Sequence, residues 1–291
     1  MVFVKLQGGL GNQMFEYATA RRIAETNKTE LKLDLSAYEN DHLRVFELGC
    51  FSIEGSVATK DELSNFQNKH ALALKCDRIV NYLKMPFSQV LITEKDFGFD
   101  QRILRLKDDK YLIGYWQSEK YFSDISSIIR KNFSFKTKPN QINAKLIEQM
   151  MSEEAVSIHV RRGDYVQNSV TNSYHGTCDL HYYHNAVSIL QKRFKNLTFY
   201  VFSDDSAWVK DNLKINAAKV YYVDHNPPDK GFEDLRLMMN CKHFIIANSS
   251  FSWWGAWLSS YEKKNIIAPK QWFKNTSLNT KDLIPYSWEI I

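Results

Sequence analysis

Two adjacent arginines, Arg161 and Arg162, follow the apolar run 155–160 and precede Gly163 and Asp164. The run has the length of a buried β-strand, so we expect the arginines at its carboxyl end. Ligands of parallel α/β sheets bind at that end, and a guanidinium presents a planar fork of donors that suits a phosphate. These residues predict an anion site. A salt bridge between domains is the structural alternative.

A glycine-rich segment, residues 8–13, stands between a strand-like run and a helix-like run. Backbone N–H groups in such a turn can cradle a phosphate, and the side-chain amides of Asn12 and Gln13 suit sugar hydroxyls. The segment is not a dinucleotide fingerprint, because Met14 stands where the third glycine belongs. It is not a P-loop either, because no Gly-Lys-Ser/Thr follows. A tight turn that needs positive φ is the structural alternative.

Acidic and hydroxyl side chains follow two further apolar runs. Asp204 and Asp205 come after one of them, and they could bind a metal, bind ribose hydroxyls or cap the next helix. The sequence contains no D-x-D, which disfavours metal-dependent diphosphate chemistry. Ser249 and Ser250 follow another run, where a helix start would place N–H groups and hydroxyls around an anion.

Two other motifs favour structural roles. Trp253 and Trp257 are four residues apart and share one helical face, which indicates core packing ahead of sugar stacking. Cys178, His181 and His184 resemble metal ligands, but they crowd one turn without a fourth partner. We expect this segment to start a helix capped by Asp179, and we predict no metal site.

Composition narrows the class of protein. The 291 residues suggest about two domains, and 44% hydrophobic and 24% charged residues indicate an ordinary globular protein. The net charge of +5 comes without a basic stripe or a reading module, so nucleic-acid binding is not predicted. Four cysteines without a C-x-x-C pair fit a reducing compartment. No apolar run approaches a membrane span or a signal-peptide core, so we expect a cytoplasmic protein, peripheral if it works at a membrane.

Along the chain, strand-like runs alternate with helical runs, and these elements must position the residues above. The alternation predicts an α/β protein with parallel sheets. In the first half we expect strands at 2–6, 31–35, 89–93 and 111–115, and helices at 12–26, 60–85 and 119–131. A polar linker is expected at 132–143. Strands at 155–160, 197–202, 218–223, 243–247 and 265–268 then form a doubly wound domain. The predicted domains are 1–138 and 139–291, facing each other across a cleft.

Four segments together resemble the bacterial α-1,2-fucosyltransferases of glycosyltransferase family 11: HVRRGDY at 159–165, GGLGNQMF at 8–15, FSDD at 202–205 and SSFSWWGAW at 249–257. They occur in the expected order over nearly the whole chain. The resemblance implies a GT-B architecture of two Rossmann-like domains, the first on the acceptor side and the second binding GDP-fucose. It also implies a β-galactoside acceptor, inversion at the transferred carbon, and no metal or other cofactor.

The same resemblance assigns residues to the site. It places Arg161 on the β-phosphate, with Arg162 beside it, and Asp234 on guanine. Glycines of the turn would close over the donor phosphates. The complete donor site that it implies is Gly9, Gly11, His159, Arg161, Arg162, Asp204, Asp234, Ser249, Ser250 and Phe251.

For the chemistry, we expect one displacement in which Arg161 stabilises the charge that develops on the leaving phosphate. Asp164 is the expected base and Asn12 would orient the acceptor hydroxyl, with Glu16 or Asp205 next as bases. Transfer of another GDP-sugar or to another hydroxyl, and a nucleotide- or carbohydrate-binding protein without turnover, are the alternatives. Segment 39–110 carries no recognised motif and is the expected place for acceptor choice.

Overall fold

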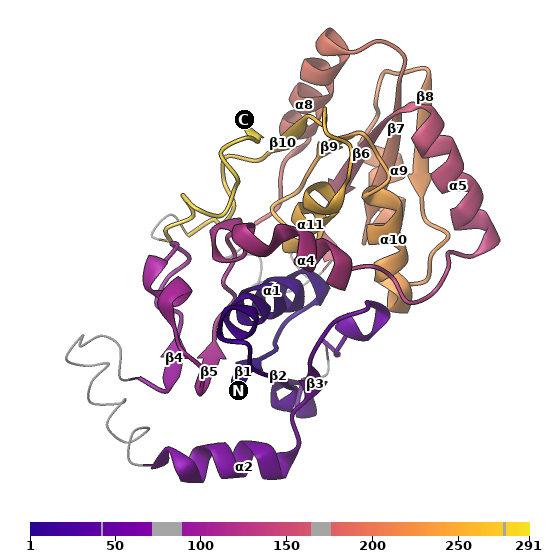
Figure 1. Ribbon diagram of the computed structural model, residues 1–291. Coiled ribbons are helices and arrows are strands. Elements are labelled where there is room, and N and C mark those ends of the chain that lie inside the picture. Colours follow the sequence, from indigo (N-terminus) through magenta and orange to yellow (C-terminus); the bar gives the residue numbers. More distant parts are fainter. Residues whose placement is uncertain (42, 72–88, 164–175, 276–277) are drawn as a thin grey trace. The chain divides into compact units, whose positions relative to one another are not determined.

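The computed structural model describes residues 1–291 except 42, 72–88, 164–175 and 276–277 (Figure 1). The chain forms two compact units, Met1–Lys136 with Asn279–Leu283, and Thr137–Leu278 with Ile284–Ile291. The chain therefore first passes from one unit to the other after Lys136. This boundary lies inside the expected linker, two residues before the predicted boundary at 138. The return of 279–283 to the first unit was not predicted. It rests on contacts of Asp282, which accepts hydrogen bonds from Ser118 Oγ at its carbonyl (2.6 Å) and from Phe99 N at its carboxylate (3.0 Å).

The first unit contains a five-stranded sheet in the order β3-β2-β1-β5-β4, and all its pairs are parallel. The central strand is almost entirely buried, which explains its continuous apolar sequence. The strands are β1 (Val2–Lys5), β2 (Leu31–Asp34), β3 (Ser56–Val57), β4 (Leu91–Thr93) and β5 (Lys110–Ile113). The two-residue strand β3 was not predicted.

The helices of this unit differ from the expected ones at two places. Instead of one helix over 119–131, the chain forms two short 3₁₀ turns and then α4, because the buried Phe122 takes φ −141° and interrupts the helical path. The helix expected to reach 85 ends at Lys69, and 72–88 lie outside the described residues. The elements are α1 (Leu10–Asn27), α2 (Lys60–Lys69), α4 (Ser126–Asn132), η1 (Ser36–Glu39), η2 (Leu48–Cys50), η3 (Gln101–Arg105), η4 (Glu119–Tyr121) and η5 (Ser123–Ile125).

The second unit contains a six-stranded parallel sheet in the order β11-β10-β9-β6-β7-β8. Its strands are β6 (Glu154–Val160), β7 (Leu197–Ser203), β8 (Lys219–Val223), β9 (His243–Ile245), β10 (Ile266–Ala268) and β11 (Glu289–Ile290). Its helices are α5 (Gln141–Ser152), α8 (Leu180–Arg193), α9 (Ser206–Asn212), α10 (Gly231–Met238), α11 (Ser250–Leu258) and the 3₁₀ turn η6 (Pro228–Lys230). Five strands match the predicted ones, and β11 was missed.

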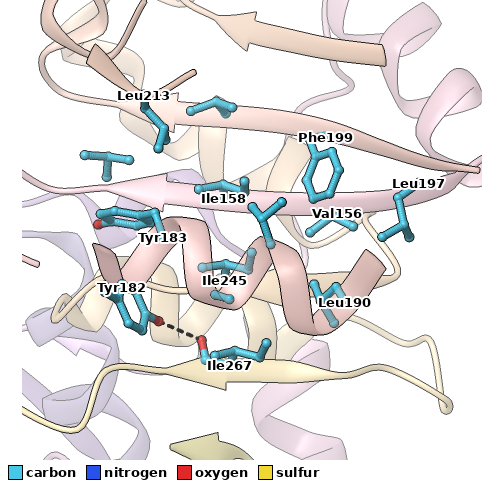
Figure 2. Close-up of a cluster of buried hydrophobic side chains, with 14 of the residues drawn as sticks. Val156, Ile158, Tyr182, Tyr183, Leu190, Leu197, Phe199, Leu213, Ile245 and Ile267 are labelled. Atoms are coloured by element: carbon cyan, nitrogen blue, oxygen red, sulfur yellow. Dashed lines mark hydrogen bonds between the residues drawn. The ribbon is translucent and has the colours of Figure 1, made fainter. Parts of the chain in front are cut away.

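Figure 2 shows the core on one face of this second sheet, where α8 lies against the strands. Apolar positions spaced along α8, including Tyr183 and Leu190, pack on Ile158, Phe199 and their neighbours. The buried hydroxyl of Tyr182 donates to the carbonyl of Ile267 at 3.1 Å, so its polar atom is satisfied inside the core. This packing fixes β6, the strand that the two arginines directly follow.

Trp253 and Trp257 confirm the core role predicted for them. They are 0% and 6% exposed, and their rings stack with centroids 6.2 Å apart. Helix α11 is therefore held by its tryptophan face, which leaves its amino end to be placed by β9.

In each sheet the strand order reverses at one point, between β1 and β5 in the first unit and between β6 and β9 in the second. The second sheet follows the order 3-2-1-4-5-6 of Rossmann-like sheets, which bind ligands outside the carboxyl ends of the strands at that reversal. Residues 161–163 follow β6 and residues 246–250 follow β9. The segments singled out in the second unit therefore meet at its expected ligand position.

Candidate functional site

Arg161 and Asp204 form an ion pair at the carboxyl edge of the second sheet. β6 and β7 are neighbours in register, with Val160 opposite Ser203, so the next residues of both strands lie side by side. Arg161 Nη1 is 3.0 Å from Asp204 Oδ2, and the backbone N–H of Arg162 donates to Oδ1 at 2.8 Å. The carboxylate thus holds a cation in place at the sheet edge, with about a fifth of the Arg161 side chain exposed.

Gly163 makes this arrangement possible. A Cβ built on Gly163 would lie only 2.4 Å from Oδ2 of Asp204. Any larger residue would push the carboxylate away from Arg161. The glycine after the arginine pair is therefore a requirement of close packing.

Arg162 and Asp205 have different partners from the neighbouring pair. The Arg162 guanidinium lies 3.5 Å from the centre of the Trp208 ring, and its Nε donates to Asp205 Oδ2 at 3.2 Å. Asp205 also caps α9, accepting from the N–H of Trp208 at 3.2 Å. Helix capping, one of the predicted alternatives, is thus the role of Asp205. The part of Trp208 was not foreseen, because nothing in the sequence links it to Arg162.

His159 is a buried, neutral histidine beside this cation. Burial, and then the charge of Arg161, lower its pKa to about 3. Its Nδ1 has no hydrogen-bond partner within the described residues, and its ring centre is 5.6 Å from that of Phe251 in the first turn of α11. The structure therefore brings His159, Arg161 and Phe251 to one edge of the sheet.

The start of α11 offers backbone donors at the same edge. Ser249 is the N-cap residue, and its side chain makes no capping hydrogen bond. The preceding Asn248 is anchored in the core, since its Nδ2 donates to the carbonyls of Gly176 and Trp272 at 3.1 Å each. A fixed helix start carries the positive end of the helix dipole, which suits an anion.

Asp234 lies in the first turn of α10 and is held by Asn226, whose Nδ2 donates to Oδ1 at 2.7 Å. Burial, with a smaller contribution from the charge of Glu233, raises the pKa of Asp234 to about 6. Asn143 of α5 donates to both Asn226 and Glu233 at 3.0 Å. This amide network around Asp234 was not predicted, since its members come from three separate segments.

In the first unit the glycine-rich turn is folded around its own side chains. Gly8 has φ +71°, as the turn alternative predicted. The Gln13 side chain is buried and donates to the carbonyls of Gly8 (3.0 Å) and Val45 (2.8 Å), so it braces the turn. This corrects the expectation that Gln13 is available to a sugar hydroxyl. Asn12 accepts from Gln117 Nε2 at 2.9 Å, which joins the turn to the segment after β5.

The amino end of α1 has an acidic partner. The N–H of Leu10 donates to Glu47 Oε2 at 2.9 Å. Gly9 is the N-cap residue, and a Cβ built on it would make only ordinary contact with Arg44, at 3.6 Å. A phosphate approaching Gly9 and Gly11 would therefore meet a carboxylate already bound at this helix start.

Of the two reserve bases, Glu16 is fully buried, accepts from Gln7 N at 2.9 Å and has a pKa that burial raises well above its usual value. The expected base, Asp164, lies outside the described residues.

Among the described residues, no group of three His, Cys, Asp or Glu side chains is placed to hold a metal ion. Asp179 caps α8 by accepting from Tyr182 N at 2.8 Å, as predicted for the segment of Cys178, His181 and His184. No helix in the described part of the chain is long and apolar enough to cross a membrane.

Known proteins resemble this chain over nearly its whole length. The model of glycosyl transferase family 11 matches residues 1–291. An α-1,2-colitosyltransferase of Escherichia coli is 36% identical over 300 residues, which cover 99% of this chain and 98% of that protein. The O-antigen biosynthesis glycosyltransferase WbnK of Escherichia coli is 30% identical over 315 residues, covering 97% and 98%.

Among solved structures, the NodZ α-1,6-fucosyltransferase soaked with GDP-fucose superposes with a TM-score of 0.50 at 13% identity. The match covers 88% of this chain and 92% of that one. At this identity the likeness concerns the fold. It confirms the predicted GT-B class with two Rossmann-like units, each built on one parallel sheet.

Proposed function

The chain belongs to glycosyl transferase family 11, and we propose that it transfers L-fucose from GDP-β-L-fucose to the 2-hydroxyl of a terminal β-galactoside, with inversion. The observation that carries the proposal is the fixed cation at the reversal of the second sheet. Arg161 is held there by Asp204 at 3.0 Å, on the same sheet edge as the buried neutral His159. Family membership makes a nucleotide-sugar the ligand that this edge would take.

In this mechanism the acceptor oxygen attacks C1 of fucose while the bond from C1 to the β-phosphate oxygen breaks. Negative charge grows on the leaving phosphate. Arg161, the start of α11 and the hydroxyl of Ser249 would stabilise that charge, and a donor fixed in advance stabilises a transition state without reorganising. We propose that these groups replace a metal, since the sequence also lacks a D-x-D grip.

The remaining donor contacts follow from the same edge. Asp234, held by Asn226, would accept from the N–H groups of guanine. Ser250 and Phe251 would lie along the nucleotide at the start of α11. Arg162, whose guanidinium packs on the Trp208 ring, would add positive charge beside Arg161.

The acceptor proton needs a base. We propose that Asp164 is this base, because it directly follows Gly163 and is three residues from Arg161 in the sequence. Asp205 is less suited, because its carboxylate already caps α9 and binds Arg162. Asn12 has no titratable group and would orient the hydroxyl instead.

A second donor has a specific observation in its favour. The relative with 36% identity is named an α-1,2-colitosyltransferase, and colitose is L-fucose without its 3-hydroxyl. A site that hydrogen-bonds a hydroxyl rejects an analogue lacking it by on the order of 10⁴-fold, whereas an apolar site discriminates weakly against an added hydroxyl. The ratio of kcat/KM for GDP-fucose and GDP-colitose therefore separates the two donors.

We further propose that the product belongs to a surface polysaccharide or O-antigen, because the relative WbnK carries that role in its name. The enzyme would act on the cytoplasmic side, peripherally at the membrane that carries the growing glycan. Recovery of the native enzyme from the periplasmic fraction would contradict this placement.

The decisive experiment incubates the full chain with GDP-fucose, or GDP-colitose, and lactose, N-acetyllactosamine or a Gal-β-1,3 acceptor. We expect GDP release that depends on the acceptor, and an α-1,2 linkage in the product by NMR. GDP binding without turnover of either donor would indicate a non-catalytic binding protein. A product with another linkage would remove the α-1,2 assignment but keep the transferase.

A further inference from the structure

A pocket of about 370 Å³ lies in the first unit, and most of its lining residues belong to the segment 39–110, which carries no recognised motif. Its walls come from the end of β4 and the residues after it, from η3, from the turn after β5, and from 279–281. The volume falls in the range of small-molecule sites. All these segments belong to the first unit, so the pocket is complete within it.

One wall of the pocket is held in a strained conformation. Trp116 has φ +54°, a left-handed backbone that a bulky residue rarely adopts. The Glu94 carboxylate fixes it by accepting from the N–H groups of Tyr115 (2.6 Å) and Trp116 (3.0 Å). Gly114 leaves room for this, since a Cβ there would lie 2.3 Å from Cβ of Glu94. Strain that the surroundings enforce in this way is typical of ligand sites.

Fixing this turn keeps the Glu94 carboxyl group in a poorly solvated place. Burial raises its pKa to about 7, against the effect of its two backbone hydrogen bonds. Burial of a carboxyl group to fix one turn indicates that this turn needs a defined position in the pocket wall.

The indole N–H of Trp116 makes no hydrogen bond within the described residues. Trp116 is 1% exposed, so this donor is buried. A buried donor without a partner is uncommon in folded proteins. A hydroxyl or carbonyl oxygen of a bound ligand would satisfy it.

Late residues of the chain close another side of the pocket. Asp282 anchors them, since its carboxylate accepts from Phe99 N (3.0 Å) and pairs with Lys120 Nζ (2.5 Å). This places Asn279 and Lys281 on the pocket wall. The chain thus returns to the first unit at the point where it completes this pocket.

The lining chemistry suits a neutral polyol. Three acidic and three basic side chains line the pocket: Glu94, Asp96, Asp100, Lys95, Arg102 and Lys281. Because Glu94 has a pKa of about 7, their charges nearly balance at neutral pH, and a strongly charged ligand has little advantage. The ring of Tyr121 lies between two others: its centroid is 4.9 Å from that of Phe99 and 5.7 Å from that of Trp116. Aromatic faces pack on the apolar C–H face of a sugar, while carboxylate and amide groups bind its hydroxyls.

The turn that carries Trp116 also reaches the glycine-rich segment. Its next residue, Gln117, donates to Asn12 Oδ1 at 2.9 Å. Pocket and glycine-rich turn are therefore joined within one unit by two consecutive residues. We propose that this pocket binds a sugar of the β-galactoside acceptor, with Trp116 Nε1 and Asn279 as hydrogen-bonding groups; the identity of that sugar as an acceptor rests on the proposed function.

The test uses lactose as the probe and two pocket variants of the full chain, Trp116→Phe and Asn279→Ala. Trp288→Phe in the second unit and Asn68→Ala on the exposed face of α2 are the matched controls. Saturation-transfer NMR measures lactose binding without donor. Steady-state rates give KM for lactose and for the donor, and the GDP-induced rise in Tm reports the donor site.

Loss of one hydrogen bond should raise KM for lactose roughly three- to tenfold in each pocket variant. Donor KM, the GDP-induced rise in Tm and both controls should stay within twofold of the parent. Lactose KM within twofold of the parent in both pocket variants would overturn the proposal, as would absence of saturation transfer to lactose in the parent. If the parent binds lactose and the variants do not, but GDP-fucose is not turned over, the pocket stands and the proposed function fails.

Discussion

The two units place polar residues at the same topological position but give them opposite electrostatic character. At the reversal of the second sheet, Arg161 is fixed by Asp204, and the N-cap side chain of α11 makes no capping bond. At the reversal of the first sheet, the first N–H of α1 already binds the Glu47 carboxylate, and a buried Glu16 lies in the same helix. One fold position can thus favour a diphosphate in one unit and disfavour it in the other.

This difference argues against the idea that a glycine-rich turn at a helix start is by itself a phosphate cradle. The turn at 8–13 has the strand before it, the helix after it and a positive φ at Gly8. One of its backbone donors, the N–H of Leu10, is however already bound by the Glu47 carboxylate of the same unit. We therefore propose that charge stabilisation belongs to the second unit and acceptor orientation to the first.

The largest effect expected from this division is on Arg161. Arg161→Ala should lower kcat by on the order of a hundredfold or more, as for loss of one fixed charge-stabilising donor, and should change donor KM less. Initial rates at saturating donor measure this. Arg193→Ala, which removes an exposed arginine paired with Glu289, is the matched control and should stay within twofold. A kcat for Arg161→Ala within threefold of the parent would show that Arg161 does not stabilise the transition state.

A tenfold effect is expected for the pH dependence of GDP binding. The raised pKa of Asp234, about 6, means that its carboxylate is ionised at pH 7.5 and mostly protonated at pH 5. If the ionised form binds guanine, the Kd for GDP should rise roughly tenfold over that interval. His159, with a pKa of about 3, stays neutral throughout and does not contribute.

Calorimetry at several pH values tests this against Asp234→Asn, which should bind GDP weakly at every pH. The variant should keep only the dependence that comes from the terminal phosphate of GDP, whose own pKa is about 6. Asp229→Asn, an exposed aspartate in η6, should keep the parent's profile. The same pH profile in Asp234→Asn as in the parent would remove Asp234 from the guanine site.

The smallest effect is expected in the first unit. Asn12→Ala removes one hydrogen bond, to Gln117, and a group that would orient the acceptor hydroxyl, so kcat should fall roughly three- to tenfold. Measured side by side with Arg161→Ala, it gives the ratio between the two sheet edges. If Asn12→Ala cost as much as Arg161→Ala, the main catalytic contribution would lie in the first unit.

Much of the fold could be predicted from local patterns. The apolar runs at 155–160 and 197–202 became β6 and β7, because strands buried on both faces read as continuous apolar stretches. Asp179 and Asp205 cap helices as their positions indicated. The helix expected over 119–131 failed, because burial of Phe122 outweighed local helix preference.

The candidate site divides in the same way. The period and length of apolar runs are local properties, so the residue types at the strand ends could be predicted from them. Their partners depend on tertiary packing: Asp204 against Arg161, Trp208 under Arg162, and Glu47 on the start of α1. Strand order and parallel register set those pairings, and both depend on packing between segments far apart in the chain, which no local pattern records.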